Sequence, residues 1–173
     1  MKFELKKIKH HKSMSEETNC YEAVVFIDGV PSVAVSNRGF GGCDEQRILA
    51  TSKHTEKEIQ DYIDKNYPPI VSNLPDPKDP EKLFSYKPDL ETICGKLFQQ
   101  WEWEQELKKL LRSKILFQTP DAPKEIYVSS YKGVRKLIPW HLENFKKEEP
   151  NATLLNLIPF PKALEIYIKT CEG

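Results

Sequence analysis

Alternating apolar and polar side chains predict that the N-terminal part of the chain forms β-strands. In residues 2–9, KFELKKIK, apolar side chains alternate with charged ones, which is the pattern of a half-buried strand. The β-branched runs YEAVVFI and VPSVAVSN flank Asp28-Gly29, a dipeptide typical of a type I′ hairpin turn with positive φ at both positions. Residues 23–27 are apolar at every position, so we expect this strand to be covered on both faces. Because proline has no N–H to donate, Pro31 predicts that its strand lies at a sheet edge at this point, or that its nitrogen faces away from the neighbouring strand.

Apolar side chains at helical spacing predict two long segments of helix after these strands. Thr55 and Glu58 form a capping box that begins the first helix, and Pro68-Pro69 ends it. The second helix covers residues 90–111 and carries an apolar stripe. We expect three side chains of that stripe to be buried, namely Leu97, Phe98 and Trp101.

The C-terminal third predicts shorter elements and a final helix. Residues 114–118 read as a strand, and a second hairpin is expected around residues 131–133, between EIYVSS and GVRKLI. A short helix opens at Pro139, ATLLN forms another short strand, and the last helix begins near Pro161. The predicted fold class is therefore α+β, with N-terminal antiparallel strands, a long central helix, a C-terminal hairpin and a C-terminal helix.

At 173 residues the chain has the length of a single domain, residues 1–173. Residues 68–89 hold six of the 13 prolines, in a connection much longer than the usual 4–6 residues or so. We interpret this stretch as a wrapped segment or a boundary. It would separate a β-rich half, 1–67, from a helical half with a hairpin, 90–173.

Composition argues against several classes of partner, namely nucleic acids, membranes and metals. The 26 basic and 26 acidic residues give a formal net charge of +0, which argues against a dedicated nucleic-acid binder. No apolar run approaches the ~20 residues of a membrane span, and the N-terminus lacks a signal peptide, so we expect a cytoplasmic protein. The four cysteines show no metal-binding spacing, so neither a metal nor a cofactor is expected. Cys94 and Cys171 lie on apolar helical stripes and are expected in the core.

Four stretches together resemble a known family. They are SEET at 15–18, the Asp28-Gly29 hairpin, the N-x-G-x-G-G stretch from residue 37, and LLNLIPFPKALEIYI at 154–168. In these the chain resembles small uncharacterised proteins encoded by bacteriophages and integrated mobile elements. The resemblance implies a compact accessory protein that acts on a host or phage component. It implies no activity and no catalytic residues.

The stretch SNRGFGGCDEQ concentrates three of the seven glycines within four positions. Consecutive backbone N–H groups of such a loop can form a nest that holds an anion, and an arginine can add a bidentate contact to phosphate or carboxylate. A bulge or wide turn needs the same positive-φ glycines, so the sequence leaves both interpretations open. The candidate ligand-binding residues within 37–44 are Asn37, Arg38, Gly39, Gly41, Gly42 and Asp44.

Three classes of function follow. The first is a non-enzymatic accessory protein that binds a host or phage protein, with Trp103 as the candidate contact because it lies off the buried stripe. The alternative is a small-molecule or nucleotide binder that uses the loop 37–44. The third is an enzyme built on scattered acids or on Cys43, with His54 as the nearest histidine in sequence to act as its base.

Overall fold

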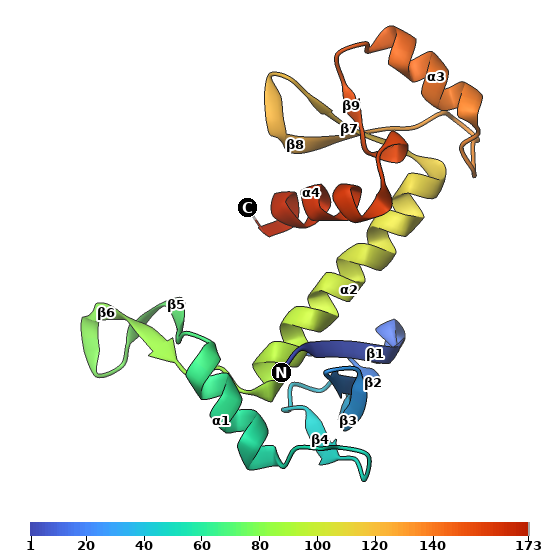
Figure 1. Cartoon of the computed structure of the whole chain (residues 1–173). Helices are drawn as coiled ribbons and strands as arrows, with labels where there is room; N and C mark the ends of the chain where they lie inside the picture. The colour runs from blue at the N-terminus through green and yellow to red at the C-terminus, as the bar shows by residue number, and fades with distance from the viewer. Residues whose placement is uncertain (173) are drawn as a thin grey trace. The chain divides into compact units, whose positions relative to one another are not determined.

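The structure, a computed structural model, describes residues 1–172 and has an α+β architecture, as the sequence predicts (Figure 1). The chain divides into two compact units, Met1–Phe98 and Gln99–Gly173. This division falls inside the long central helix, α2 (Leu90–Ser113). The Pro-rich stretch belongs to the first unit. Among residues 1–172, no helix combines the length and the hydropathy that a membrane span requires.

The first unit is built on a four-stranded antiparallel sheet in the order β1-β2-β3-β4. Its strands are β1 (Phe3–His10), β2 (Tyr21–Ile27), β3 (Val30–Asn37) and β4 (Glu45–Ile48), and the short 3-10 helix η1 (Lys12–Met14) lies between β1 and β2. Asp28 and Gly29 turn the β2–β3 hairpin with φ values of 49° and 81°. The predicted hairpin and its positive φ angles are therefore confirmed.

One face of β2 is buried and the other is only half-covered. Ala23, Val25 and Ile27 are buried, whereas Val24 and Phe26 are of intermediate exposure. The expectation that this strand is covered on both faces was therefore wrong. The apolar side chains of its second face do not reach an opposing layer, and the Lys6 ammonium lies over the Phe26 ring instead.

Pro31 lies where β3 has a neighbour on one side only. It pairs with Phe26 of β2 across a bulge, and the pairing of β3 with β4 begins two residues later, at Val33. A proline nitrogen cannot donate to a sheet, so this local edge is where it can be accommodated.

Helix α1 (Glu56–Asn66) and the first turns of α2 carry the side chains that cover the buried face. The capping box is confirmed: the Thr55 hydroxyl accepts the Glu58 N–H while the Glu58 carboxylate accepts the Thr55 N–H. Phe98 is buried, with its ring centroid 4.6 Å from that of Tyr21 on β2.

The stripe of α2 is less buried than its spacing predicts. Leu97 and Trp101 are half-buried, so the expectation that both are enclosed was wrong. Cys94 is fully buried, as expected, and burial raises the pKa of its thiol to about 12.

The Pro-rich stretch forms a separate two-stranded sheet, β5 (Ile70–Asp76) and β6 (Asp79–Tyr86). A hairpin therefore occupies the stretch that we interpreted as a wrapped segment or a boundary. Pro75 is accommodated at register shifts between the two strands, where a missing N–H breaks no regular ladder.

The second unit contains a three-stranded sheet in the order β8-β7-β9. The strands are β7 (Ile115–Thr119), β8 (Ala122–Ser129) and β9 (Thr153–Leu154), and the helices are α3 (Pro139–Glu148), η2 (Leu155–Leu157) and α4 (Phe160–Glu172). The C-terminal hairpin turns between Thr119 and Ala122, and residues 130–138 form turns and loops. The hairpin expected at residues 131–133 was therefore placed too far along the chain.

Strand β7 passes through the core of the second unit. Its neighbours Ile115 and Leu116 are both fully buried and belong to different apolar clusters. Successive side chains of a strand point to opposite faces, so each face of β7 has its own cluster. Leu116 packs with residues of α2, η2 and α4, and Ile115 packs with Phe145 of α3. The exposed Cys171 lies at the end of α4 and outside this core, contrary to expectation.

Candidate functional site

The Gly-rich loop is organised around the buried side chain of Asn37. Its Nδ2 donates to the carbonyl of Gly42 at 2.9 Å and to the Asp44 carboxylate at 3.1 Å. Its Oδ1 accepts from the Gly39 N–H and from the Thr18 hydroxyl, both at 2.8 Å. One amide therefore closes the loop across residues 37–44 and ties it to the preceding connection.

Gly39 is where that connection comes closest to the loop. Its carbonyl accepts the backbone N–H groups of Glu16, Glu17 and Thr18 at 3.0, 3.0 and 3.3 Å. Its φ is 89°, and a Cβ at this position would lie 2.3 Å from the Met14 carbonyl oxygen. Neither the φ angle nor the available space permits a side chain here. The fold itself therefore requires glycine at position 39.

The other loop glycines differ from each other. Gly41 also has a left-handed φ, 85°, and its N–H donates to the Thr18 hydroxyl at 3.3 Å. Gly42 has open space around a Cβ and no positive φ. The N–H groups of Gly39 and Gly41 therefore donate to acceptors within the protein. In an anion-binding nest, these N–H groups would point toward a ligand instead.

Acidic groups surround the closed loop. Asp44 accepts a hydrogen bond from the Tyr21 hydroxyl, and its own N–H donates to the Glu91 carboxylate at 3.1 Å. Burial and the adjacent Asp44 carboxylate raise the pKa of Tyr21 well above its ordinary range, so the phenol stays protonated as a donor. This arrangement of carboxylates opposes an anionic ligand. Binding of a small molecule or nucleotide at 37–44 stays a prediction.

Arg38, Phe40 and Cys43 are exposed side chains of this loop. The Arg38 guanidinium lies 3.1 Å from the Glu45 carboxylate, with more than half of each side chain exposed. Such an exposed pair contributes little, about 0–1 kcal/mol. Cys43 is a free, exposed thiol. Among residues 1–172, no group of three or more His, Cys, Asp or Glu side chains could hold a metal ion.

Trp103 is half-buried in the second unit. It packs against a cluster that includes Leu107, Leu155 and Tyr167. Trp140, at the start of α3, is the more exposed tryptophan, with 58% of its surface accessible. Sequence spacing separated Trp103 from the apolar stripe of α2 but gave no sign that a second cluster covers it.

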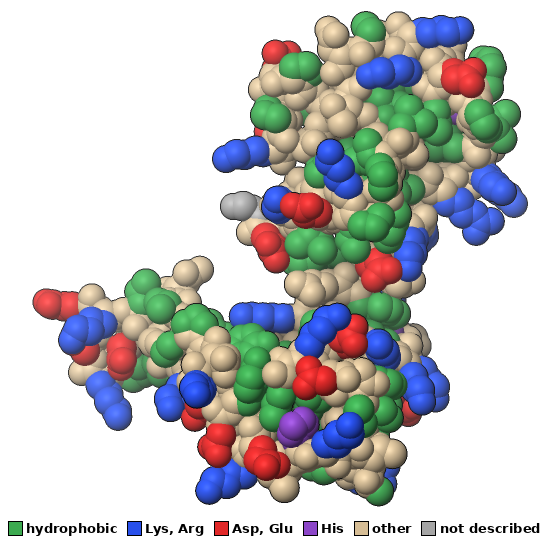
Figure 2. Space-filling view, in the orientation of Figure 1, with side chains coloured by type: hydrophobic (Ala, Val, Ile, Leu, Met, Phe, Trp, Pro, Cys, Tyr) green, Lys and Arg blue, Asp and Glu red, His purple; other side chains and the backbone are tan. Residues whose placement is uncertain are grey.

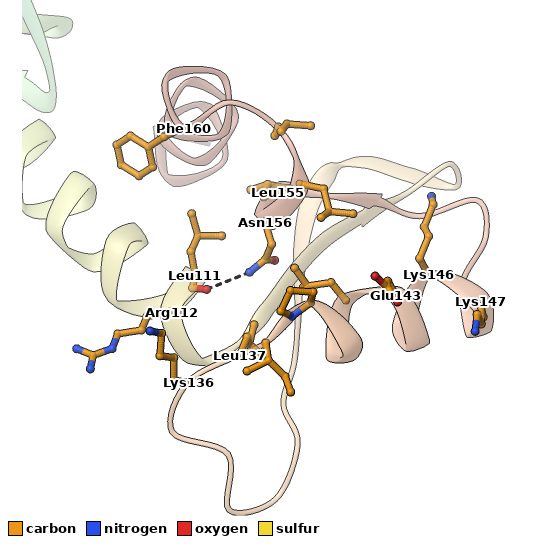
Figure 3. A pocket seen from close by; sticks show the side chains of 15 residues that line it. Leu111, Arg112, Lys136, Leu137, Glu143, Lys146, Lys147, Leu155, Asn156 and Phe160 are labelled. Carbon is orange, nitrogen blue, oxygen red and sulfur yellow. Dashed lines mark hydrogen bonds between the residues drawn. The ribbon is translucent and has the colours of Figure 1, made fainter.

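A large apolar groove lies within the second unit and was missed by the sequence analysis. It has a volume of about 830 Å³ and lies between the end of α2, the 136–139 segment, α3 and the η2–α4 connection (Figure 3). Figure 2 shows hydrophobic side chains gathered on one face of this unit, with Lys and Arg side chains at the margins. We define the groove by its apolar lining, which comprises Leu111, Leu137, Ile138, Pro139, Leu142, Leu155, Leu157, Ile158 and Phe160.

Asn156 fixes the floor of the groove. Its Nδ2 donates to the carbonyls of Leu111 and Lys114 at 3.1 and 2.9 Å, and its Oδ1 accepts the Leu116 N–H at 2.9 Å (Figure 3). This amide satisfies one of the last carbonyls of α2, the carbonyl of Lys114 just after the helix, and one N–H of β7. The adjacent 130–138 loop is held by the Leu137 N–H, which donates to the Arg112 carbonyl at 2.9 Å. The groove is therefore preformed.

Charged side chains at the rim are mostly basic. The cations among the lining residues are Arg112, Lys136, Lys146 and Lys147, and the only acid among them is Glu143. The sequence contained a signal for this site. In GVRKLIPW, two cations directly precede three apolar side chains, and LNLIPF places apolar residues in a short connection between elements. GVRKLI was instead interpreted as part of the second hairpin, and the start of LNLIPF as the end of a short strand before the last helix.

Comparison with known proteins found no matching family model, no matching curated protein and no matching solved structure.

Proposed function

We propose that the protein is a non-enzymatic binding protein that holds a segment of another protein in the groove of its second unit. The observation that supports this most directly is the size and character of the groove. Its volume of about 830 Å³ lies within the range of about 300–1,000 Å³ that is usual for binding sites. Its lining is mostly apolar, and Arg112, Lys136 and Lys147 lie at its margins in Figure 3.

Exposed side chains at the edge of the groove favour a macromolecular partner. Ile138 is 53% exposed and Leu157 is 59% exposed, and Trp140, two residues after Ile138, is 58% exposed. Large apolar side chains gathered at one surface of a folded protein mark interaction sites more often than isolated ones do.

The resemblance to proteins of bacteriophages and mobile elements adds a context to this proposal. It implies that the partner belongs to a host cell or to a phage. The proposed binding role does not depend on this context, because the groove alone supports it.

An affinity purification with matched variants tests the proposal. Leu157→Glu places a carboxylate at the mouth of the groove, and Leu74→Glu makes the same change at an exposed position in the first unit. Tagged parent protein and both variants are incubated with host-cell lysate, and captured proteins are quantified by mass spectrometry. We expect a partner that the parent and Leu74→Glu retain and Leu157→Glu loses. An identical set of captured proteins for all three would refute the proposed role.

A further inference from the structure

We propose that the groove recognises an acidic amphipathic helix, whose apolar face fills the groove and whose carboxylates meet the cations at its two ends. This inference rests on the proposed function and specifies the chemistry of the partner.

The basic rim is available for an acidic partner. None of the residues 1–172 forms an ion pair with Arg112, Lys136 or Lys147. All three side chains belong to exposed residues. Lys146 is partly engaged, since its ammonium donates to the Ala152 carbonyl at 2.6 Å. The lining therefore carries four cations against one acid, Glu143, which gives the rim a local positive charge in a chain whose formal net charge is +0.

These charges lie at opposite ends of the groove. In Figure 3, Arg112 and Lys136 are on one side of the lining and Lys147 is on the other, with Leu137 between them. A single anionic head group, such as that of a fatty acid, can reach only one of these ends. A peptide with acidic residues at both ends of its apolar face can reach both, so the distribution of charge favours a peptide.

The lining favours a helical peptide over an extended one. An extended segment brings unpaired backbone N–H and C=O groups into the groove, and burying each without a partner is costly. The groove offers mainly apolar side chains, and its one central amide, Asn156, is already fully bonded to Leu111, Lys114 and Leu116. A helix pairs its own backbone groups and presents apolar side chains at i, i+3, i+4 and i+7.

The length of the site matches about three helical turns. Helix α3 forms one wall with 10 residues, and a helix rises about 1.5 Å per residue, so this wall is about 15 Å long. A partner helix of about ten residues spans the same distance. Its Asp or Glu residues would then fall in the first and last turns of the contact.

A displayed peptide library tests this inference on the full chain. The library holds 16-residue segments with random residues at every position, and binders are selected on the parent and counter-selected on Leu157→Glu. We expect the selected peptides to carry apolar residues at helical spacing and to be enriched several-fold in Asp and Glu at both ends. Enrichment of Lys and Arg, enrichment of proline-rich extended sequences, or no peptide that distinguishes the two proteins would each overturn the inference.

Charge-reversal variants test the roles of the rim. A selected peptide is labelled, and its affinity is measured by fluorescence polarisation for the parent, Lys136→Glu, Lys147→Glu and the control Lys132→Glu. Lys132 is exposed in the same loop as Lys136 but does not line the groove. Reversing a rim charge removes an attraction and adds a repulsion. We therefore expect each groove variant to lose affinity roughly 5- to 30-fold, which is about 1–2 kcal/mol of binding free energy per variant. The control should stay within twofold of the parent.

Different results would refute the binding of a protein partner and the recognition of an acidic helix. If lysate capture depends on Leu157 but no acidic helix is selected, a protein partner is supported and its acidic helical chemistry is refuted. Equal loss for Lys132→Glu and the rim variants would also refute specific recognition by the rim. If laurate displaces the peptide from the parent and binds more tightly than any peptide, the groove is a site for small amphiphiles and both proposals fall.

Discussion

Replacing Gly39 with alanine should destabilise the first unit more than any other glycine substitution in its loop. The added Cβ would lie 2.3 Å from the Met14 carbonyl oxygen and 3.0 Å from the Cys20 Cβ. The first contact is with backbone, so a side-chain rotation cannot relieve it. Relief requires the connection to move away, which weakens the hydrogen bonds that the Gly39 carbonyl accepts from Glu16 and Glu17.

The size of the effect follows from two contributions. Alanine in a left-handed conformation costs about 1–2 kcal/mol relative to glycine. Weakening the three hydrogen bonds to the Gly39 carbonyl costs about 0.5–1.5 kcal/mol for each bond that is lost. We therefore expect the free energy of unfolding of the first unit to fall by about 3–5 kcal/mol.

The matched control is Gly42→Ala in the same loop. A Cβ on Gly42 meets no atom within 4 Å, so the change should stay within about ±0.5 kcal/mol. Urea unfolding followed by circular dichroism gives the two free energies. Hydrogen exchange of peptides covering residues 12–45 shows whether the loss is local. Equal effects of the two substitutions would refute the argument that close approach requires Gly39.

Three further predictions concern buried or half-buried groups. Phe98→Ala should lower the free energy of unfolding by about 3–5 kcal/mol, because the ring is enclosed and packs on Tyr21; a variant that unfolds like the parent would remove it from the core. Asn156→Ala removes three hydrogen bonds and should cost about 2–4 kcal/mol in urea unfolding, and a cost below 1 kcal/mol would mean that water replaces the amide. Burial raises the pKa of Cys94 from 9.0 to about 12, so its contribution to stability is present below pH 9.0 and is lost as the pH rises toward 12. At pH 8 iodoacetamide should therefore modify the exposed Cys43 and spare Cys94, and equal rates at the two thiols would contradict this.

The elements that local signals specify were predicted well. Asp28-Gly29 and the Thr55 capping box are decided by residues that lie next to each other, so the turn and the start of α1 could be predicted. The second hairpin was placed incorrectly because GVRKLI has the composition of a strand. Its backbone instead forms a loop held by the Leu137 N–H bond to Arg112, a contact between residues far apart in sequence.

The candidate sites show the same limit. The glycine cluster indicated left-handed backbone, and this is what Gly39 and Gly41 adopt. The reason for it, the approach of Met14 and the amide of Asn37, is a tertiary contact that no local pattern encodes. The groove was missed because its walls come from four separate segments, each of which alone resembles part of a buried core.

The distribution of aromatic residues makes the two units separately visible to spectroscopy. All three tryptophans, at positions 101, 103 and 140, belong to the unit Gln99–Gly173, whereas Tyr21, Tyr62, Tyr67 and Tyr86 belong to Met1–Phe98. Light that excites indole but not phenol therefore reports on the second unit alone. Circular dichroism reports on both units together. If the two signals change at different denaturant concentrations, the units unfold independently, and if they coincide, the chain unfolds as one cooperative body.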